Sequence, residues 1–497
     1  MRIACVGGGP GGLFFAALVK QADPTVDVTV FERNRPEDTF GFGVVFSDAT
    51  LAAIHDADPV LRVGLAEHGR HWDRIEVRLK GRRIGCGGNG MAAIVRRTLL
   101  RLLRERAERV GVRLRFQTEV DLPDVADYDL VVAADGANSR LRGRLADALV
   151  PEVEVATAKF IWFGTTYAFD GLTFVHERGP HGTFAVHGYP IGDGLGTFIV
   201  ETDEATWRAA GLDEFDVAQP PGPSDEKSRR YLEKLFAEQI DGHELLTNNS
   251  RWANFRTWRT RRWHTGNVAL LGDAAHTAHF SVGSGTKMAL EDAVALAGSL
   301  AAHPGDLPAA LDAYQAARQP AVARIQGAAR PSLSWWEHFG AYHDAFEPAQ
   351  FAFHFLSRSI GRDRLAKRDP DFVELVERDW LDTHGTPPLD TPIRLGDTVL
   401  PSRLTTVDDL TVPLLSVTAP EHEADLPSTF AELASAIEAA PALVAVAGGS
   451  PLTRCLVAER VRLVHRLPAL VVEDIPDRDR ALTLVLSGRA DLVGWPA

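Results

Sequence analysis

Apolar positions at the start of the chain follow two different periods. Residues 2–6 form a continuous apolar run, residues 13–22 place apolar side chains at helical spacing, and residues 26–32 return to a second apolar run. Short apolar runs predict buried strands, and a helical period between two such runs predicts a β–α–β unit. The glycine-rich segment 7–12 then forms the turn between the first strand and the helix.

Further along, the pattern changes twice. Residues 94–111 have the spacing of an amphipathic helix, and residues 128–139 read as a buried strand that runs into a turn. Short runs rich in β-branched and aromatic residues, separated by glycine, then predict a mostly antiparallel sheet. The apolar strand predicted at 267–273 restores the α/β pattern.

These changes define the predicted domains of an α/β protein. The first domain comprises 1–155 and 265–365 and is interrupted by a mostly antiparallel β-sheet domain at 156–264. Residues 366–390 contain most of a proline-rich stretch and are predicted to be a linker. The remaining segment, 391–497, is predicted to be a small α/β domain.

Composition limits the classes of function. The chain has 497 residues and a formal net charge of −14 at pH 7, which argues against a nucleic-acid partner. Cys5, Cys86 and Cys455 form no CxxC pair, so we expect neither a disulfide framework nor a metal site, and a cytoplasmic location. The glycines at 7–12 interrupt the apolar amino terminus, so we expect no targeting or membrane segment.

Gly7, Gly9 and Gly12 form a GxGxxG motif between the first predicted strand and helix. In a Rossmann-like unit the first glycine permits the turn, the second lets backbone amides approach a pyrophosphate, and the third lets the helix pack on the strand. Glu32 ends the next strand, where a carboxylate can accept hydrogen bonds from a ribose, and Arg33 follows it. This context favours a dinucleotide site over a purely structural turn.

Two later motifs indicate which dinucleotide is bound. Asp135 and Gly136 open the segment DGANSRLR, and Gly272 and Asp273 open the segment GDAAH. Together with GxGxxG, these segments resemble the class A flavoprotein monooxygenases. The resemblance implies FAD as the cofactor, NAD(P)H as co-substrate, and contact of Asp273 with the ribityl chain of FAD.

Three further residues match cofactor contacts of that family. Arg96 stands where the family places an arginine that reaches the FAD pyrophosphate, with a solvated helix arginine as the alternative. Gly283 and Gly285 match glycines that let a helix start approach the flavin ring. The proline and asparagine usual in this segment are Phe280 and Lys287 here.

A narrower resemblance concerns the substrate. Residues 31–51 and 272–287 resemble the salicylyl-CoA and anthraniloyl-CoA hydroxylases and, in part, a violacein-type hydroxylase. The resemblance implies hydroxylation of an activated ring with O2 through a flavin C4a-hydroperoxide, for example salicylyl-CoA to gentisyl-CoA. A tryptophan or indole hydroxylase, a free aromatic acid hydroxylase and a non-catalytic FAD-binding protein remain alternatives. The sequence does not distinguish NADH from NADPH.

Candidate residues for the wall of the substrate pocket are mostly aromatic. We predict this wall from Val45, Trp162, His187, Tyr189 and Phe280. Each of these residue types is also common in a packed core, which is the alternative at every position.

Two basic side chains are candidates for other roles in the substrate site. Arg259 lies in the arginine-rich segment RTWRTRRW, which could hold the phosphates of a CoA ester or form a solvated, salt-bridged face. His279 is the candidate catalytic group beside the glycine-rich turn, since imidazole titrates near neutral pH, and a structural role is its alternative.

The last part of the chain carries a second resemblance. Residues 391–404 resemble the opening of Old Yellow Enzyme-type barrels, and residues 466–496 resemble their last β–α units. A complete (β/α)8 barrel takes about 250 residues, and the segment 391–497 is much shorter. We expect a shortened remnant without a second flavin site, with buried strands at 444–449 and 470–472, that serves packing or the formation of a homodimer.

Overall fold

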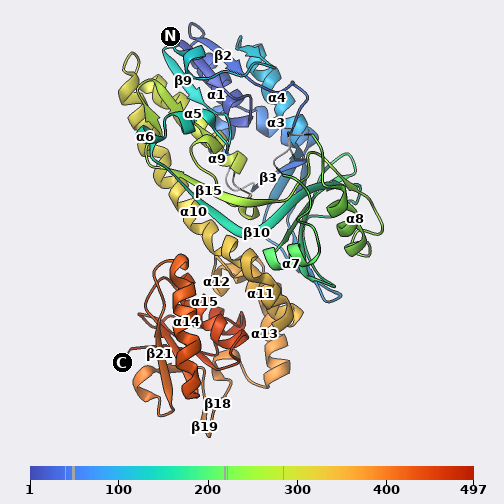
Figure 1. Cartoon of the computed structure of the whole chain (residues 1–497), viewed down its shortest axis with the longest axis vertical. Helices are drawn as coiled ribbons and strands as arrows, with labels where there is room; N and C mark the ends of the chain where they lie inside the picture. Colours follow the sequence, from blue (N-terminus) through green and yellow to red (C-terminus); the bar gives the residue numbers. More distant parts are fainter. Residues whose placement is uncertain (40, 48–50, 218–219, 221, 284, 497) are drawn as a thin grey trace. The chain divides into compact units, whose positions relative to one another are not determined.

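The chain divides into two compact units. The computed structural model describes residues 1–39, 41–47, 51–217, 220, 222–283 and 285–496, so a few positions of the segments 31–51 and 272–287 lie outside it. The first unit comprises Met1–Glu76 with Asn89–Glu337, and the second comprises Val77–Gly88 with His338–Ala497 (Figure 1). Within the described residues, no helix combines the length and apolar character needed to cross a membrane.

A six-stranded sheet forms the α/β part of the first unit. Its strand order is β16-β17-β9-β1-β2-β8, and every neighbouring pair is parallel except β16–β17. The strands are β1 (Arg2–Val6), β2 (Asp27–Phe31), β8 (Arg113–Arg115), β9 (Leu130–Ala133), β16 (His264–Thr265) and β17 (Val268–Leu270). Because β1, β9 and β17 are parallel, the loops that follow them meet at one edge of the sheet.

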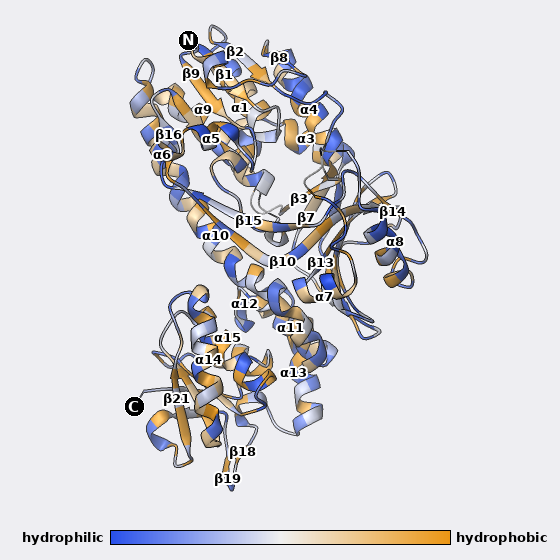
Figure 2. Cartoon of the chain, in the orientation of Figure 1, coloured by the Kyte–Doolittle hydropathy of each residue, from blue (hydrophilic) through white to orange (hydrophobic). Residues whose placement is uncertain are grey.

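Helices cover this sheet and bury most of its side chains. Helix α1 buries a continuous stretch from Gly11 to Val19, and Leu13, Phe14 and Phe15 join the main hydrophobic core. The hydrophobic colour of β1 and β9 in Figure 2 marks the same core. The helices of this part are α1 (Pro10–Ala22), α4 (Arg96–Arg109), α5 (Arg140–Arg144), α6 (Ala146–Leu149), α9 (Gly285–Ala302) and α10 (Leu307–Ala345). The predicted Rossmann-like α/β architecture is confirmed.

A small antiparallel sheet is formed by residues that lie between α1 and α4 in sequence. Its order is β3-β7-β4, and Val45 on β3 pairs with Ala93 on β7. The elements are β3 (Gly43–Ser47), α2 (Ala52–Ala57), α3 (Val60–His68), β4 (Arg70–Trp72) and β7 (Met91–Val95). This sheet brings the segment after Glu32 back to the start of α4, where Arg96 N donates a hydrogen bond to Phe42 O at 2.9 Å.

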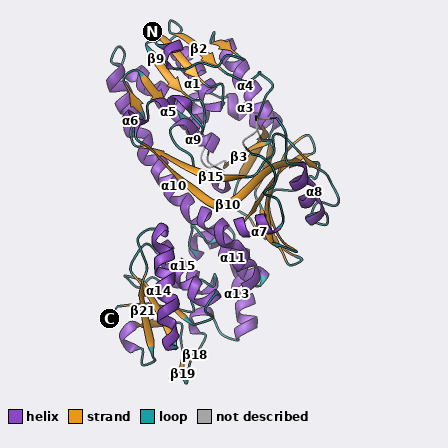
Figure 3. Ribbon diagram, in the orientation of Figure 1, coloured by secondary structure: helices purple, strands orange, loops and turns teal. Residues whose placement is uncertain are grey.

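The predicted antiparallel sheet follows in the first unit. Strands β14, β10, β13, β12 and β11 are neighbours in that order, and β15 also pairs with β10. The elements are β10 (Pro151–Thr165), β11 (Leu172–Gly179), β12 (Gly182–Gly192), β13 (Leu195–Thr202), α7 (Glu204–Ala209), α8 (Glu226–Leu235), β14 (Leu245–Leu246) and β15 (Ala253–Thr260). These long strands are drawn in orange in Figure 3.

The two faces of this sheet have different roles because side chains alternate along a strand. Ile161, Phe163, Val186 and Phe198 belong to a closed hydrophobic cluster with residues of α8. The opposite face carries six side chains in register across three strands: Phe160, Trp162, His187, Tyr189, Ile199 and Glu201. Three of the predicted pocket residues, Trp162, His187 and Tyr189, lie on this second face.

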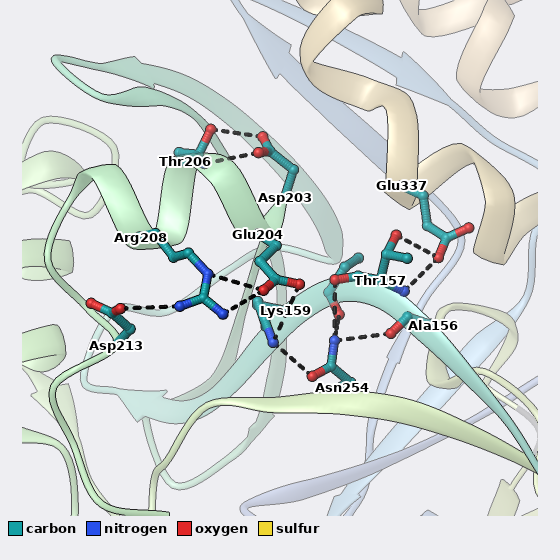
Figure 4. Close-up of polar contacts among 11 residues, drawn as sticks. Ala156, Thr157, Lys159, Asp203, Glu204, Thr206, Arg208, Asp213, Asn254 and Glu337 are labelled. Atoms are coloured by element: carbon teal, nitrogen blue, oxygen red, sulfur yellow. Dashed lines mark hydrogen bonds and ion pairs between the residues drawn. The ribbon is translucent and has the colours of Figure 1, made fainter. Parts of the chain in front are cut away.

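A bulge bends the long strand β10 where it changes partners. The register of β10 with β15 shifts between Val155 and Lys159. Asn254 Nδ2 donates hydrogen bonds to the carbonyl groups of Ala156, Thr157 and Ala158 at 2.9, 3.1 and 3.3 Å, as Figure 4 illustrates. Thr157 N and Oγ1 both donate to Glu337 Oε1. The polar backbone groups freed by the bulge are therefore satisfied locally.

The second unit contains a helix where we expected a linker. Helix α13 occupies most of 366–390 and buries Phe372, Val376 and Trp380. The prediction was wrong because Pro370 begins an amphipathic helix, where proline is tolerated, and the other prolines of the segment follow the helix. The unit also contains α11 (Pro348–Leu356), α12 (Arg362–Arg368), α13 (Pro370–His384) and most of the strands β5 (Ile75–Leu79) and β6 (Arg82–Cys86).

A five-stranded parallel sheet forms the carboxyl-terminal part of this unit. Its order is β20-β24-β23-β22-β21. The strands that come first and last in the sequence, β20 and β24, are therefore neighbours. The elements are β18 (Ile393–Leu395), β19 (Thr398–Leu400), β20 (Leu404–Thr406), β21 (Leu414–Thr418), α14 (Leu426–Ala436), β22 (Leu443–Ala447), α15 (Pro451–Leu463), β23 (Ala469–Val472), α16 (Arg478–Leu486) and β24 (Leu492–Trp495). Strands and helices alternate here, but the compact unit that contains them starts at His338 and includes Val77–Gly88, so its bounds differ from the predicted 391–497.

A buried polar cluster lies at the centre of the second unit. His354 Nε2 lies 3.1 Å from Glu459 Oε1, and the Tyr342 hydroxyl donates to the other oxygen of Glu459. Arg489 Nη2 donates to the carbonyl of His354 at 2.7 Å. Burial, and after it the neighbouring Arg489 guanidinium, lowers the pKa of His354 from 6.5 to about 4.

This depressed pKa makes the second unit sensitive to acid. Between pH 6.5 and about 4 the unfolded chain binds a proton at His354 that the folded state does not, so stability falls as the pH falls. We expect a total loss of about 3 kcal/mol across this window. His354→Gln, which keeps a donor for Glu459, will reduce the loss, whereas the exposed His422→Gln will not. Urea unfolding of the second unit at pH 8 and pH 5, a range that covers about 2 kcal/mol of this loss, measures the difference.

Candidate active site

The three glycines of GxGxxG have three different surroundings at the end of β1. Gly7 has φ +116°, and a Cβ added there would lie 2.1 Å from Ala134 O. A Cβ on Gly12 would lie 2.2 Å from Gly7 O, so these two glycines are required by the packing of the protein itself. A Cβ on Gly9 would have no atom of the described residues within 4 Å. Gly9 therefore borders open space at the start of α1.

Glu32 stabilises the turn at the end of β2. Its Oε2 accepts a hydrogen bond from Gly8 N at 2.8 Å, and its Oε1 accepts from Asn34 N at 2.8 Å. The carboxylate thus lies beside the glycine-rich turn, as the motif predicts. Arg33 points its exposed side chain away from the core.

The loop after β9 joins the loop after β17 through Arg142. The buried Arg142 guanidinium donates to Ala137 O at 2.6 Å and to Ala274 O at 2.9 Å, and it stacks on Trp258 at 3.7 Å. Asp135 Oδ2 accepts from Arg140 N at 2.8 Å, while Oδ1 is buried and has no hydrogen-bond partner in the described part of the chain. Gly136 follows with φ +84°.

Arg96 and Asp273 bring unpaired polar atoms to the same region. Arg96 Nε is buried without a hydrogen-bond partner among the described residues, and burial lowers the pKa of this guanidinium. Gly272 has φ +62° and places Asp273 in the turn η3 (Gly272–Ala274). Although solvent reaches the Asp273 side chain, desolvation by the surrounding protein raises its pKa. A buried cation and carboxylates with open positions fit the phosphates and hydroxyl groups of a dinucleotide.

A buried aspartate that the motifs did not reveal supports this turn. Asp292 on α9 accepts from Gly272 N at 3.2 Å, contacts His276 Nε2 at 2.7 Å and accepts from Arg318 Nε at 2.8 Å. Burial alone would raise its pKa, but His276 and Arg318 lower it. Only the tertiary fold shows which side chains Asp292 contacts.

The glycine-rich turn before α9 lies against the small sheet. Gly283 has φ +60°, and a Cβ there would lie 3.2 Å from Val45 Cγ1. Gly285, the first residue of α9, has open space around its Cβ position in the part of the chain that is described. Lys287 pairs with Glu291 on the same helix. The start of α9 is therefore accessible, and the lysine is held by its own helix.

The predicted wall residues come together in one aromatic cluster. Trp162, Tyr189, Val45 and Phe280 belong to the same group of packed side chains. The Phe280 ring lies 5.6 Å from Trp162 and 5.4 Å from His187. Through Val45, this cluster adjoins the glycine-rich turn that precedes α9.

Arg259 and His279 both contact other side chains of the protein. Arg259 is half exposed, pairs with Glu154 at 3.2 Å and is not part of the aromatic cluster. Its geometry matches the salt-bridged alternative. His279 is buried, with Nδ1 2.7 Å from Ser281 Oγ and Nε2 3.6 Å from Glu201. It supports the turn that carries Phe280.

Comparison with known proteins identifies the family. A family model for an FAD binding domain matches residues 124–329. A salicyloyl-CoA 5-hydroxylase from a Streptomyces species is 59% identical over 99% of this chain and 99% of its own length. The chain belongs to the FAD-dependent aromatic monooxygenases. This monooxygenase uses FAD with NAD(P)H as co-substrate, as the three motifs indicated.

Other relatives match about two thirds of the chain. A 3-hydroxy-4-methyl-anthranilyl-[aryl-carrier protein] 5-monooxygenase from Streptosporangium sibiricum is 39% identical, and a protodeoxyviolaceinate monooxygenase from Chromobacterium violaceum is 34% identical. Each alignment covers 68% of this chain and 89% of the relative. The p-nitrophenol 4-monooxygenase of Pseudomonas putida shares the fold, with TM-score 0.56 at 18% identity over 76% of this chain and 96% of its own.

Proposed function

We propose that this monooxygenase hydroxylates the ring of an aryl-CoA thioester, with salicylyl-CoA as the first candidate and gentisyl-CoA as its product. The observation that carries the proposal is the aromatic cluster around Phe280, which adjoins the glycine-rich turn before α9 through Val45. Two relatives support the substrate class, because their names describe an aromatic acyl group joined to CoA or to a carrier protein.

The polar groups at the edge of the six-stranded sheet would hold FAD. In this proposal the amides beside Gly9 and the Arg96 guanidinium bind the pyrophosphate, Glu32 faces the ribose, and Asp273 faces the ribityl chain. The start of α9 at Gly285 approaches the flavin ring. When bound, FAD supplies the redox chemistry that uses NAD(P)H and O2 to transfer one oxygen atom to the substrate ring.

The protein's own contribution is to orient the ring and exclude water. Phe280, Trp162 and Tyr189 present flat or edge-on aromatic surfaces that can contact an aryl group. Tyr189 is buried and the other two rings are partly buried, so this wall would limit the access of solvent to the reacting face. Arg259 is left out of the proposed site, since Glu154 already pairs with it.

Steady-state turnover with four substrates tests the proposal. We expect NAD(P)H oxidation and hydroxylated product with salicylyl-CoA or anthraniloyl-CoA, and little product with free salicylate or tryptophan. Hydroxylation of a free acid without any response to its CoA ester would overturn the substrate class. The nicotinamide preference follows from running each assay with NADH and with NADPH.

Arg96 gives a separate prediction for the cofactor site. Because its buried Nε has no partner among the described residues, Arg96→Gln should weaken FAD binding by about tenfold or more, the value of one lost charge-assisted contact. The neighbouring Arg97 is exposed, so Arg97→Gln is the matched control and should bind FAD normally. Titration of the apoprotein with FAD, followed by flavin fluorescence, compares the two. Equal affinities would place the pyrophosphate elsewhere.

We further propose that the carboxyl-terminal part is the remnant of a reductase barrel and contributes to a homodimer. Pairing of the first strand, β20, with the last strand, β24, is the arrangement that closes a β/α barrel, and the described part has five strands instead of eight. One FAD per chain, and no reduction of an enoyl substrate, would support the remnant. Light scattering of the intact chain and of variants at exposed Val464 or Ile475 tests the dimer.

A further inference from the structure

One charged side chain lies on the aromatic, pocket-facing side of the antiparallel sheet. Glu201 on β13 is opposite Phe160 on β10 and shares its face with Trp162 and Ile199. Its side chain is only 1% exposed. Because burial of an unpaired carboxylate is very unfavourable, the contacts of Glu201 determine its role.

Two histidines share this carboxylate. His187 Nε2 on β12 lies 2.6 Å from Glu201 Oε1, and His279 Nε2 lies 3.6 Å from Oε2. Both imidazole rings are almost fully buried. Burial alone would raise the pKa of Glu201, but His279 and then His187 lower it to about 2. The carboxylate is therefore ionised at neutral pH, and the Nε2 atom of each histidine faces it.

The far side of His279 is bonded to the turn that carries Phe280. His279 Nδ1 accepts a hydrogen bond from Ser281 N at 3.4 Å and lies 2.7 Å from Ser281 Oγ, which contacts Ser332 Oγ at 2.8 Å. A ring nitrogen that accepts from a backbone N–H carries no proton, so the ring proton lies on Nε2 and faces Glu201. His279 is also the N-cap of η4 (Phe280–Val282).

We propose that Glu201 is a positioning residue of the hydroxylation site, whose carboxylate fixes the Nε2–H form of His279 and thereby the turn that bears Phe280. The proposal rests on the proposed function, in which Phe280 walls the ring pocket. His187 reaches the same carboxylate, and its ring lies 5.4 Å from Phe280 on the other side. Only His279 belongs to the turn, so Glu201 acts on Phe280 through His279 and does not contact the substrate.

The first test measures the tautomer of His279 and needs no substrate. The holoenzyme is labelled with 15N-histidine, and the resonances are assigned by their loss in His279→Gln and His187→Gln. In the wild type we expect an unprotonated Nδ1 and a protonated Nε2 at His279. In Glu201→Gln, which preserves the shape of the side chain, we expect a mixture of tautomers. An unchanged tautomer in Glu201→Gln overturns the proposal.

The second test measures coupling, the amount of hydroxylated product per NAD(P)H consumed. A carboxylate that fixes a histidine tautomer in a catalytic triad is worth about four orders of magnitude in turnover. Since His279 acts here through Phe280, we expect a smaller loss of coupling in Glu201→Gln, roughly tenfold. FAD content and Tm should stay close to the wild type, which separates positioning from general damage to the fold.

Two controls complete the design. Glu204 is half exposed, and its ion pairs with Lys159 and Arg208 are drawn in Figure 4, so Glu204→Gln should leave both readouts unchanged. The double variant Glu201→Gln/His279→Gln should lose no more coupling than His279→Gln alone. If the coupling losses of Glu201→Gln and His279→Gln multiply in the double variant, the proposal is overturned. If the wild type hydroxylates no aryl-CoA ester, the proposed function fails, while the tautomer result still decides the role of Glu201.

Discussion

Alanine at Gly7 is expected to abolish FAD binding and to destabilise the first unit, whereas alanine at Gly9 should leave the apoprotein as stable as the wild type. The difference follows from the space around each residue. At Gly7 the new Cβ would lie 2.1 Å from Ala134 O in a backbone conformation, φ +116°, that L-residues rarely adopt. The blocking oxygen belongs to the residue directly after β9, whose N–H is bonded to Val6 O at 2.8 Å, so this backbone cannot move away easily.

At Gly9 the backbone has φ −73° and ψ 176°, which any residue can adopt, and the Cβ would meet no atom of the described residues. The open space is where the proposed pyrophosphate lies, so Gly9→Ala should weaken FAD binding by about tenfold or more while Tm of the apoprotein is unchanged. Thermal unfolding without FAD and flavin titration separate the two effects. Normal FAD affinity in Gly9→Ala would show that the cofactor does not approach this turn.

Removal of Asp292 is expected to have the second largest effect. Asp292→Ala would leave His276 without its buried counter-ion, Arg318 with Glu291 alone, and Gly272 N without its acceptor. Breaking a buried ion pair from one side typically costs about 3–5 kcal/mol. Since Gly272 begins the turn that carries Asp273, we also expect loss of FAD from this variant.

The control for Asp292 is an exposed pair of the same type. Asp312 lies 3.1 Å from His264 Nε2, and its side chain is 77% exposed, so Asp312→Ala should change stability by less than about 1 kcal/mol. Urea unfolding of both apoproteins gives the free energies, and flavin absorbance gives the FAD content. A loss below 1 kcal/mol in Asp292→Ala would mean that the network contributes little.

The cofactor site could be predicted from the sequence because its requirements are local. Gly7 and Gly272 are needed where a turn leaves a strand, and Gly12 where α1 packs on the first of these turns, because positive φ or close backbone contact excludes other residues there. Turns of this kind leave a short, recognisable pattern. The parallel pairing of β1, β9 and β17 then brings the turns together.

The supporting residues could not be predicted in the same way. Glu201 and Asp292 each contact partners on distant strands or helices, and nothing in their neighbouring residues marks them as buried charges. The linker prediction failed because proline spacing was weighed above the amphipathic period of α13. Arg259 was chosen from an arginine-rich segment, and only the fold shows that Glu154 pairs with it.

The strand order of the carboxyl-terminal sheet has a consequence for biosynthesis. Strand β24 lies between β20 and β23. A strand near the start of the carboxyl-terminal segment therefore pairs with the strand at its end. During translation, β20 and β23 leave the ribosome with exposed edges and must wait for β24. The first unit can fold earlier, and the second is then the part of a nascent chain that most needs a chaperone.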